Sequence, residues 1–100
     1  MGTLRVRVIS KKAIADFAAI HAGAAVPLLH WLQVSRRAEW RSLADVREDF
    51  RHADRVGEYT VFNIAGNKYR LIATIKYEWQ VVYIRHILTH SGYDRGEWNK

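Results

Sequence analysis

The stretch that decides the fold is EYTVFNIAGNKYRLIATIKYEWQVVYIRHIL, residues 58–88. Apolar and polar residues alternate in it, and Tyr, Val, Ile and Thr are frequent, which is typical of half-buried β-strands. The strands that we predict cover residues 58–64, 68–77 and 80–88. A turn at Ala65-Gly66-Asn67 and a tight connection at Glu78-Trp79 separate them. Consecutive strands joined by such short turns predict an antiparallel meander.

The residues before this stretch predict one more strand and a pair of helices. Residues 4–9 alternate strictly, so we expect a strand that joins the sheet as a fourth. Ser10 is a candidate N-cap for a helix over residues 11–21, and Gly23 is a candidate stop signal. Pro27 suits the first turn of a second helix that runs to about residue 39.

Two further segments complete the pattern. Ser42 and Asp45 form a capping signal for a short third helix that ends near Phe50, and residues 89–100 are polar and irregular. A strand, a helical hairpin and then a meander predict an α+β fold with helices on one face of the sheet. The second helix should bury one face of the hairpin, made of Leu28, Trp31, Leu32 and Ser35.

The composition narrows the class of protein. The 100 residues are 49% apolar and 26% charged, which fits a single domain over residues 1–100. The absence of cysteine excludes disulfides, cysteine zinc sites and thiol catalysis. No apolar run approaches the roughly 18–20 residues of a membrane helix, and residues 1–8 do not resemble a signal peptide. We therefore expect a cytoplasmic protein without a membrane partner.

The net charge of +6 favours a polyanionic partner, most often a nucleic acid. The basic excess lies at the two ends of the chain, while residues 13–50 are neutral to slightly acidic. Candidate contacts to RNA phosphates are Arg5, Arg7, Lys11, Lys12, Arg36, Arg37 and Arg41. A purely solubilising role of these residues is the alternative.

Several motifs resemble those of HigB-type toxins. They are VFNIAGNKYRLI over residues 61–72, VYIR over 82–85, and THSGYD over 89–94. The opening VISKKA, residues 8–13, and WRSLADV, residues 40–46, match as well, so the similarity spans nearly the whole chain. Two positions depart from the family pattern, which usually has a proline at Arg51 and a larger polar residue at Gly92.

This resemblance implies a RelE-like fold and the toxin of a type II toxin–antitoxin pair. Such toxins are endoribonucleases that cut mRNA, typically in the ribosomal A site, and a helix-turn-helix antitoxin of the HigA type neutralises them. The expected partners are therefore mRNA, the ribosome and that antitoxin. No metal or other cofactor is expected, because the 2′-OH of RNA can itself attack the neighbouring phosphate.

Candidate catalytic residues follow from the chemistry and from the resemblance. Lys68 and Arg70 project from one face of their predicted strand, about 6–7 Å apart, and could bracket a phosphate. Arg85, in an otherwise apolar strand, is either a phosphate clamp or a member of an ion pair. A solvated strand face is the alternative for the first two, and the resemblance favours Arg70 above all.

Three further candidates follow the last predicted strand. His90 can move protons near neutral pH, and Tyr93 could do so in the field of nearby cations. Asp94 could orient His90 or pair with Arg95. The resemblance places a His or basic residue and a Tyr here, without deciding which is acid and which is base.

Other residue types carry weaker signals. The spacing of His86 and His90 suits metal ligands on a helix, but a strand does not bring them together, so we discount zinc. Trp79 and Trp98 could be exposed and stack on bases, whereas Trp31 belongs to the core. Two alternatives to a ribonuclease remain: an inactive RNA- or antitoxin-binding module of the same fold, suggested by Gly92, and a basic structural domain.

Overall fold

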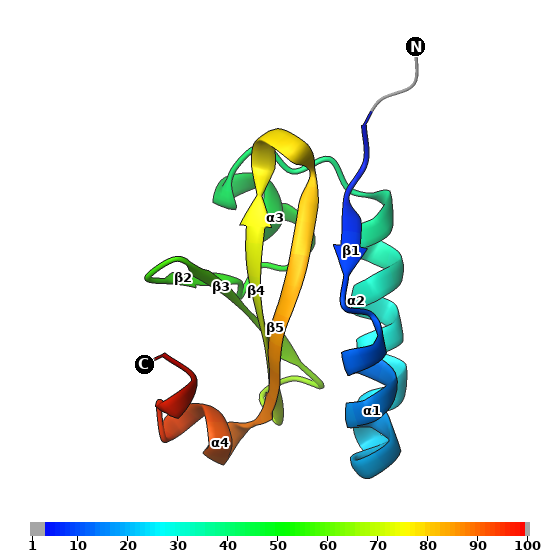
Figure 1. The fold of residues 1–100 in the computed structure, drawn as a ribbon, viewed down its shortest axis with the longest axis vertical. Helices are drawn as coiled ribbons and strands as arrows, with labels where there is room; N and C mark the ends of the chain where they lie inside the picture. Colours follow the sequence, from blue (N-terminus) through cyan, green and yellow to red (C-terminus); the bar gives the residue numbers. More distant parts are fainter. Residues whose placement is uncertain (1–3, 100) are drawn as a thin grey trace.

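A five-stranded sheet forms the centre of the structure, a computed structural model that describes residues 4–99 (Figure 1). Its strands are β1 (Arg7–Ile9), β2 (Asp54–Val56), β3 (Tyr59–Ile64), β4 (Tyr69–Lys76) and β5 (Val81–Thr89). They lie in the order β1-β5-β4-β3-β2, and every neighbouring pair is antiparallel except the parallel pair β1 and β5. The predicted α+β class and the predicted meander are confirmed.

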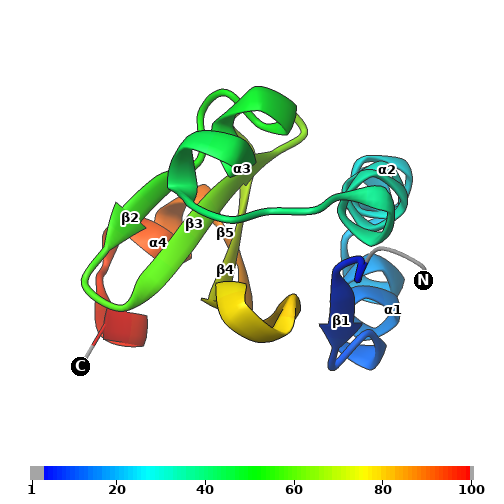
Figure 2. The same cartoon turned by 90° about the horizontal axis from the view of Figure 1, so that it is seen from above.

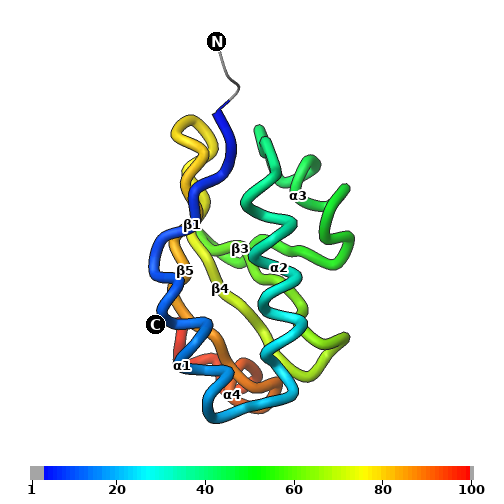
Figure 3. The backbone as a smooth tube through the Cα atoms, turned by 90° about the vertical axis from the view of Figure 1, so that its right-hand side faces the viewer, coloured from blue at the N-terminus to red at the C-terminus, as the bar shows by residue number. Residues whose placement is uncertain are grey.

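Helices surround this sheet. They are α1 (Lys12–Ile20), α2 (Ala25–Arg37), α3 (Leu43–Asp49) and α4 (His90–Asp94). Short 3₁₀ segments are η1 (Ala22–Ala24), η2 (Tyr77–Trp79) and η3 (Glu97–Asn99). Helices α1 and α2 form the predicted antiparallel hairpin beside the sheet, as Figures 2 and 3 show. Among residues 4–99, no helix has the length and hydropathy that a bilayer span requires.

The main core lies between α2, α3 and one face of the sheet. Strand alternation puts Phe62, Leu71 and Val82 on this face, and all three are fully buried. Leu28, Trp31 and Ser35 are the buried residues of α2, which confirms most of the predicted helix face. Trp40 stacks near Phe62, with ring centroids 6.2 Å apart, and extends this core.

The opposite face of the sheet carries the residues of the candidate site. The register pairs Asn63 with Arg70 and Ile72 with His86, so these side chains share that face. A β-bulge between Ile72 and Ala73 shifts the register of β4 and β5, which leaves Arg85 as the extra residue of β5. The C-terminal segment reaches this face, where Trp98 contacts Tyr59 of β3.

Four local predictions were wrong. Strand β2 was missed, because three residues are too short for alternation to be visible. The residues after β5 form α4 and η3 instead of an irregular tail. Ser10 does not cap α1 with its side chain, since its φ is 73° and the N-cap residue is Lys11. Gly23 does not end α1 either, because the helix stops at Ile20 and Gly23 lies in η1.

Other boundaries moved by a few residues. Strand β1 is shorter than residues 4–9, and α2 ends at Arg37 rather than near residue 39. At α3, Ser42 is the N-cap residue, but the hydrogen bond there runs from the Arg41 N–H to the Asp45 carboxylate, 2.9 Å away. Pro27 does lie in the first turn of α2.

Gln80 ties the β4–β5 connection to the segment before α3. Its Oε1 accepts the backbone N–H of Trp40 at 3.0 Å, and its amide nitrogen donates to the carbonyls of Trp40 and Tyr77. Both Gln80 and Trp40 are buried, so water cannot replace these hydrogen bonds. One amide side chain therefore satisfies both backbone groups of a buried tryptophan.

We expect Gln80→Ala to lower the free energy of unfolding by about 2–4 kcal/mol, because two buried backbone groups of Trp40 lose their partner. Urea denaturation measures this as a lower midpoint at an unchanged slope. Gln33→Ala on the exposed face of α2 is the control, with a change below about 0.5 kcal/mol. Equal effects of the two substitutions would contradict the role assigned to Gln80.

Candidate active site

Arg70 is the most unusual residue of the structure, because its charged side chain is nearly buried. Its exposed fraction is 8%, and charged residues are almost never buried without a partner. The ion pairs within residues 4–99 do not include it, so no carboxylate neutralises its charge in the structure described. A buried positive charge without a carboxylate is suited to bind an anion.

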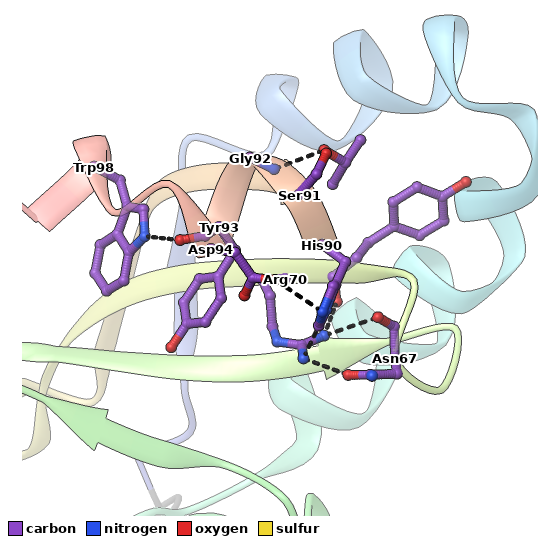
Figure 4. A network of polar contacts seen from close by, with 10 residues as sticks. Asn67, Arg70, His90, Ser91, Gly92, Tyr93, Asp94 and Trp98 are labelled. Atoms are coloured by element: carbon purple, nitrogen blue, oxygen red, sulfur yellow. Dashed lines mark hydrogen bonds and ion pairs between the residues drawn. The ribbon is translucent and has the colours of Figure 1, made fainter.

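Neutral acceptors hold the Arg70 guanidinium in place (Figure 4). Nη1 donates to the carbonyls of Asn67 and Tyr69, both at 3.2 Å. Nη2 donates to the Asn67 side-chain oxygen and faces Nδ1 of His90 at 3.2 Å. These four contacts match the four N–H bonds of the two terminal nitrogens, and the fifth donor, Nε, makes no hydrogen bond within residues 4–99.

The contacts of His90 define its tautomer. An arginine can only donate, so Nδ1 of His90 accepts from Arg70, and the imidazole proton lies on Nε2. Nε2 is 3.0 Å from a carboxylate oxygen of Asp94, one turn further along α4. His90 thus lies between a guanidinium and a carboxylate, and nearly half of its side-chain surface (46%) stays accessible.

Tyr93 completes the cluster. The Arg70 guanidinium lies over its ring, with Cζ 5.3 Å from the ring centroid. On its other side the ring is stacked with Trp98 at 5.2 Å (Figure 4). Arg70, His90, Tyr93 and Asp94, four of the six predicted catalytic residues, are therefore brought together by β4 and α4.

The first turn of α4 fixes the backbone around these residues. Oγ1 of Thr89 accepts the N–H of Gly92 at 3.1 Å, which is the hydrogen bond of a helix N-cap. The backbone at Gly92, the position that departs from the family pattern, is therefore fixed by this hydrogen bond. A Cβ atom at this position would lie 3.2 Å from Thr89 Oγ1, so a larger residue needs a small shift of the cap.

Lys68 and Arg85 lie outside this cluster. Lys68 is exposed in the turn before β4, not in the strand, and its carbonyl accepts the N–H of His90 at 2.9 Å. Arg85 is exposed, donates from Nε to Thr74 Oγ1 at 3.1 Å and lies over the Tyr83 ring at 4.9 Å. The ion pair considered for Arg85 does not form among residues 4–99.

The predicted RNA-binding residues are all exposed, and none of them forms a hydrogen bond with Arg70. They are Arg5, Arg7, Lys11, Lys12, Arg36, Arg37 and Arg41. Lys12 forms an ion pair with Asp16 at 3.6 Å, and Arg36 and Arg37 lie in the last turn of α2, where cations are favoured. That end of α2 lies at the opposite end of the molecule from α4 (Figure 1).

Sequence reasoning missed two contributors to the cluster. Asn67 was expected only to shape its turn, yet it supplies two of the acceptors that hold Arg70. Trp98 was expected to be exposed, yet it is half-buried against Tyr93. An isolated tryptophan in a polar segment is a signal for such packing, since large aromatic side chains gain most from burial.

A second polar region lies near the far end of β4. A surface cavity of about 580 Å³ there is lined by Arg41, Ile75, Lys76, Tyr77 and Glu78. Burial raises the pKa of Tyr77, although a hydrogen bond with Thr60 and the charge of Arg55 oppose this effect. Tyr77 is therefore a neutral hydroxyl at physiological pH. About 20 Å of strand separates it from Arg70.

Fold and site together define a small basic α+β protein in which a nearly buried arginine, a histidine, a tyrosine and an aspartate cluster on the sheet face opposite the main core. The chain matches a family described as "HigB_toxin, RelE-like toxic component of a toxin-antitoxin system" over residues 24–96. It therefore belongs to the HigB toxin family, and the predicted RelE-like fold is confirmed.

Individual relatives agree with this assignment. The chain is 38% identical over 47 residues to the "mRNA interferase toxin HigB" of Escherichia coli K12 and to the "mRNA interferase HigB" of Shigella flexneri. The aligned segment covers 47% of this chain and 42% of each relative. The chain thus matches less than half the length of these proteins.

We expect Asn67→Asp to weaken anion binding about tenfold. The new carboxylate contacts the Arg70 guanidinium and competes with the negatively charged ligand for it. The free energy of unfolding should change by less than about 1 kcal/mol. Fluorescence anisotropy with a labelled single-stranded oligodeoxynucleotide, which has no 2′-OH to react, measures the affinity at fixed salt.

Gln33→Glu on α2 is the control for this experiment, since it makes the same change in net charge at an exposed site. Equal weakening by both variants would mean that net charge alone governs binding, and Arg70 would not be the anion site.

Proposed function

We propose that this protein is the toxin of a type II toxin–antitoxin pair and an endoribonuclease that cuts mRNA. The observation that carries the proposal is the nearly buried Arg70 guanidinium, held by neutral acceptors beside two groups able to move protons, His90 and Tyr93. A phosphodiester is an anion that suits such a charge. Membership of the HigB toxin family and the names of the similar mRNA interferases support this assignment.

In the proposed reaction, Arg70 carries the negative charge of the scissile phosphate. The phosphate binds Nε of Arg70 and takes over Nη2, which frees Nδ1 of His90. Nδ1 then accepts the proton of the 2′-OH, whose oxygen forms a bond to phosphorus. Asp94 stabilises the imidazolium from the Nε2 side.

Tyr93 donates its phenolic proton to the 5′-oxygen as the bond from phosphorus to that oxygen breaks. The products are a 2′,3′-cyclic phosphate and a 5′-hydroxyl, and exchange with water restores both side chains. Placing Tyr93 as the acid follows from its hydroxyl, which is free of the contacts that occupy both nitrogens of His90. Positive charge on the phosphate is expected to contribute most to the rate.

Further residues bind the mRNA and the ribosome. Arg85 lies on the same sheet face as Arg70, and we assign it to a phosphate further along the mRNA. The exposed basic residues at β1, α1 and the end of α2 contact ribosomal RNA, so cleavage takes place on the ribosome, in the cytoplasm. A helix-turn-helix antitoxin of the HigA type is the neutralising partner.

A sulfur substitution separates the roles of His90 and Tyr93. Mapping new mRNA 5′ ends after brief induction identifies a cleaved bond, and a synthetic mRNA then carries sulfur in place of its bridging 5′-oxygen. Tyr93→Phe should slow single-turnover cleavage of the oxygen mRNA about 100-fold or more. On the sulfur mRNA this defect should nearly vanish, because a thiolate leaves without a proton.

His90→Gln should stay slow on both mRNAs, because its defect concerns the attacking 2′-OH. The reverse pattern would exchange the acid and the base. Wild-type protein that binds ribosomes but leaves both mRNAs uncut would favour the inactive binding module instead.

Arg85→Ala should raise the mRNA concentration at half-maximal rate about tenfold and leave the maximal rate nearly unchanged, because this residue does not contact the Arg70 cluster. The Arg85→Ala substitution should also reduce the salt dependence of mRNA binding. Thr74→Val, which removes only the hydroxyl that holds Arg85, is the matched control and should give a smaller effect. A loss of maximal rate in Arg85→Ala would instead mean that Arg85 contacts the scissile phosphate.

A further inference from the structure

The Tyr93 ring is enclosed on both of its faces. Trp98 stacks on it with ring centroids 5.2 Å apart and planes inclined by 16°, and the Arg70 guanidinium lies over it at 5.3 Å. Figure 4 shows the tyrosine ring between these two side chains. The indole N–H of Trp98 also donates to the backbone carbonyl of Tyr93 at 3.0 Å. Trp98 thus holds both the ring and the backbone of Tyr93.

Trp98 is itself attached to the sheet. The ring of Tyr59, at the start of β3, meets Trp98 edge-on, with centroids 5.7 Å apart and planes inclined by 70°. By strand alternation Tyr59 shares a sheet face with Asn63, the register partner of Arg70. A row of side chains from Tyr59 through Trp98 and Tyr93 therefore ends at Arg70.

The short helix α4 alone does not fix the position of Tyr93, and this row of side chains does. The helix has five residues, too few to be stable without tertiary contacts. Its cap at Thr89 and the carbonyl of Lys68 hold its first residues, while Tyr93 lies near its end. The contacts that fix the Tyr93 side chain come from Arg70 and Trp98, and only Trp98 is free of a role at the phosphate.

We propose that Trp98 is a positioning residue for the proton transfer by Tyr93. It holds the phenol ring so that the hydroxyl, and not a ring face, is offered to the RNA. Because both ring faces are covered, Tyr93 does not stack on a base. This inference rests on the proposed ribonuclease activity and adds a residue on which the leaving-group step depends.

Single-turnover cleavage by Trp98→Leu tests the proposal. The maximal rate on the oxygen mRNA should fall about 10- to 100-fold, as expected for a misplaced catalytic group, with the half-saturating concentration unchanged within about twofold. The defect should nearly vanish on the mRNA with a 5′-bridging sulfur. Trp98→Phe, which keeps a ring to stack, should recover most of the rate.

Two further proteins make the test specific. The double variant Trp98→Leu/Tyr93→Phe should be no slower than Tyr93→Phe alone, because Trp98 acts through Tyr93. Trp79→Leu is the matched control, since Trp79 lies in η2 with an exposed fraction of 69%, and its rate should equal that of the wild type. Thermal unfolding checks that each variant folds.

Three results would overturn the inference while leaving the ribonuclease intact. Trp98→Leu could cleave at the wild-type rate, it could raise only the half-saturating concentration, or it could slow the Tyr93→Phe protein as much as the wild type. If Trp98→Leu fails to fold, the same comparisons apply to Trp98→Phe, whose smaller defect must also vanish on the sulfur mRNA. Wild-type cleavage by Tyr93→Phe would instead refute the proposed function, and this inference with it.

Discussion

The candidate site depends on one constraint, the burial of a guanidinium without a carboxylate. Arg70 must place its donors on neutral oxygens and a ring nitrogen, and the structure supplies them from the turn before β4 and from α4. The turn can do this because Ala65 and Gly66 both adopt positive φ, 54° and 69°, which aims Asn67 back at the strand. The site and the hairpin turn therefore form one structural unit.

The two faces of the sheet differ in their contents: one face carries the main core, and the other carries the Arg70 cluster. Leu71 and Arg70 are neighbours in β4, yet Leu71 belongs to the core under α2 while Arg70 faces the C-terminal segment. The core face is closed by aromatic packing around Phe62 and Trp31. The other face is covered by short elements, because Tyr93 of α4 and Trp98 of η3 contact Arg70 and Tyr59 there. Substitutions on one face should leave the other largely unaffected.

Most of the sheet could be predicted from the sequence, because β3, β4 and β5 have six or more residues each and are rich in β-branched and aromatic side chains. Strand β2 and helix α4 could not, since they have three and five residues and depend on tertiary contacts rather than on a repeating pattern. The placement of Lys68 failed because the strand begins one residue later, at Tyr69. A β-bulge, which leaves no trace in the alternation, decided the position of Arg85.

The site was predicted by resemblance more than by pattern. Arg70, His90 and Tyr93 were named because similar toxins have matching residues, and Asp94 because it could orient His90. Their spacing along the chain alone would not have joined them. Asn67 and Trp98 escaped notice because each acts through a neighbour whose position only the fold defines. Residues that hold other residues are the hardest to find in a sequence.

The parallel pairing of β1 with β5 has a consequence for how the protein is made. Arg7 pairs with Val81, so nearly the whole domain must be synthesised before the first strand finds its partner. Contacts this distant in sequence form late and slow the folding of a small domain. His90, Tyr93 and Trp98 follow β5 in the chain, so a chain that ends before β5 lacks both the partner strand of β1 and the cluster. The partner strand of β1 and the residues of the cluster therefore emerge during the same late stage of synthesis.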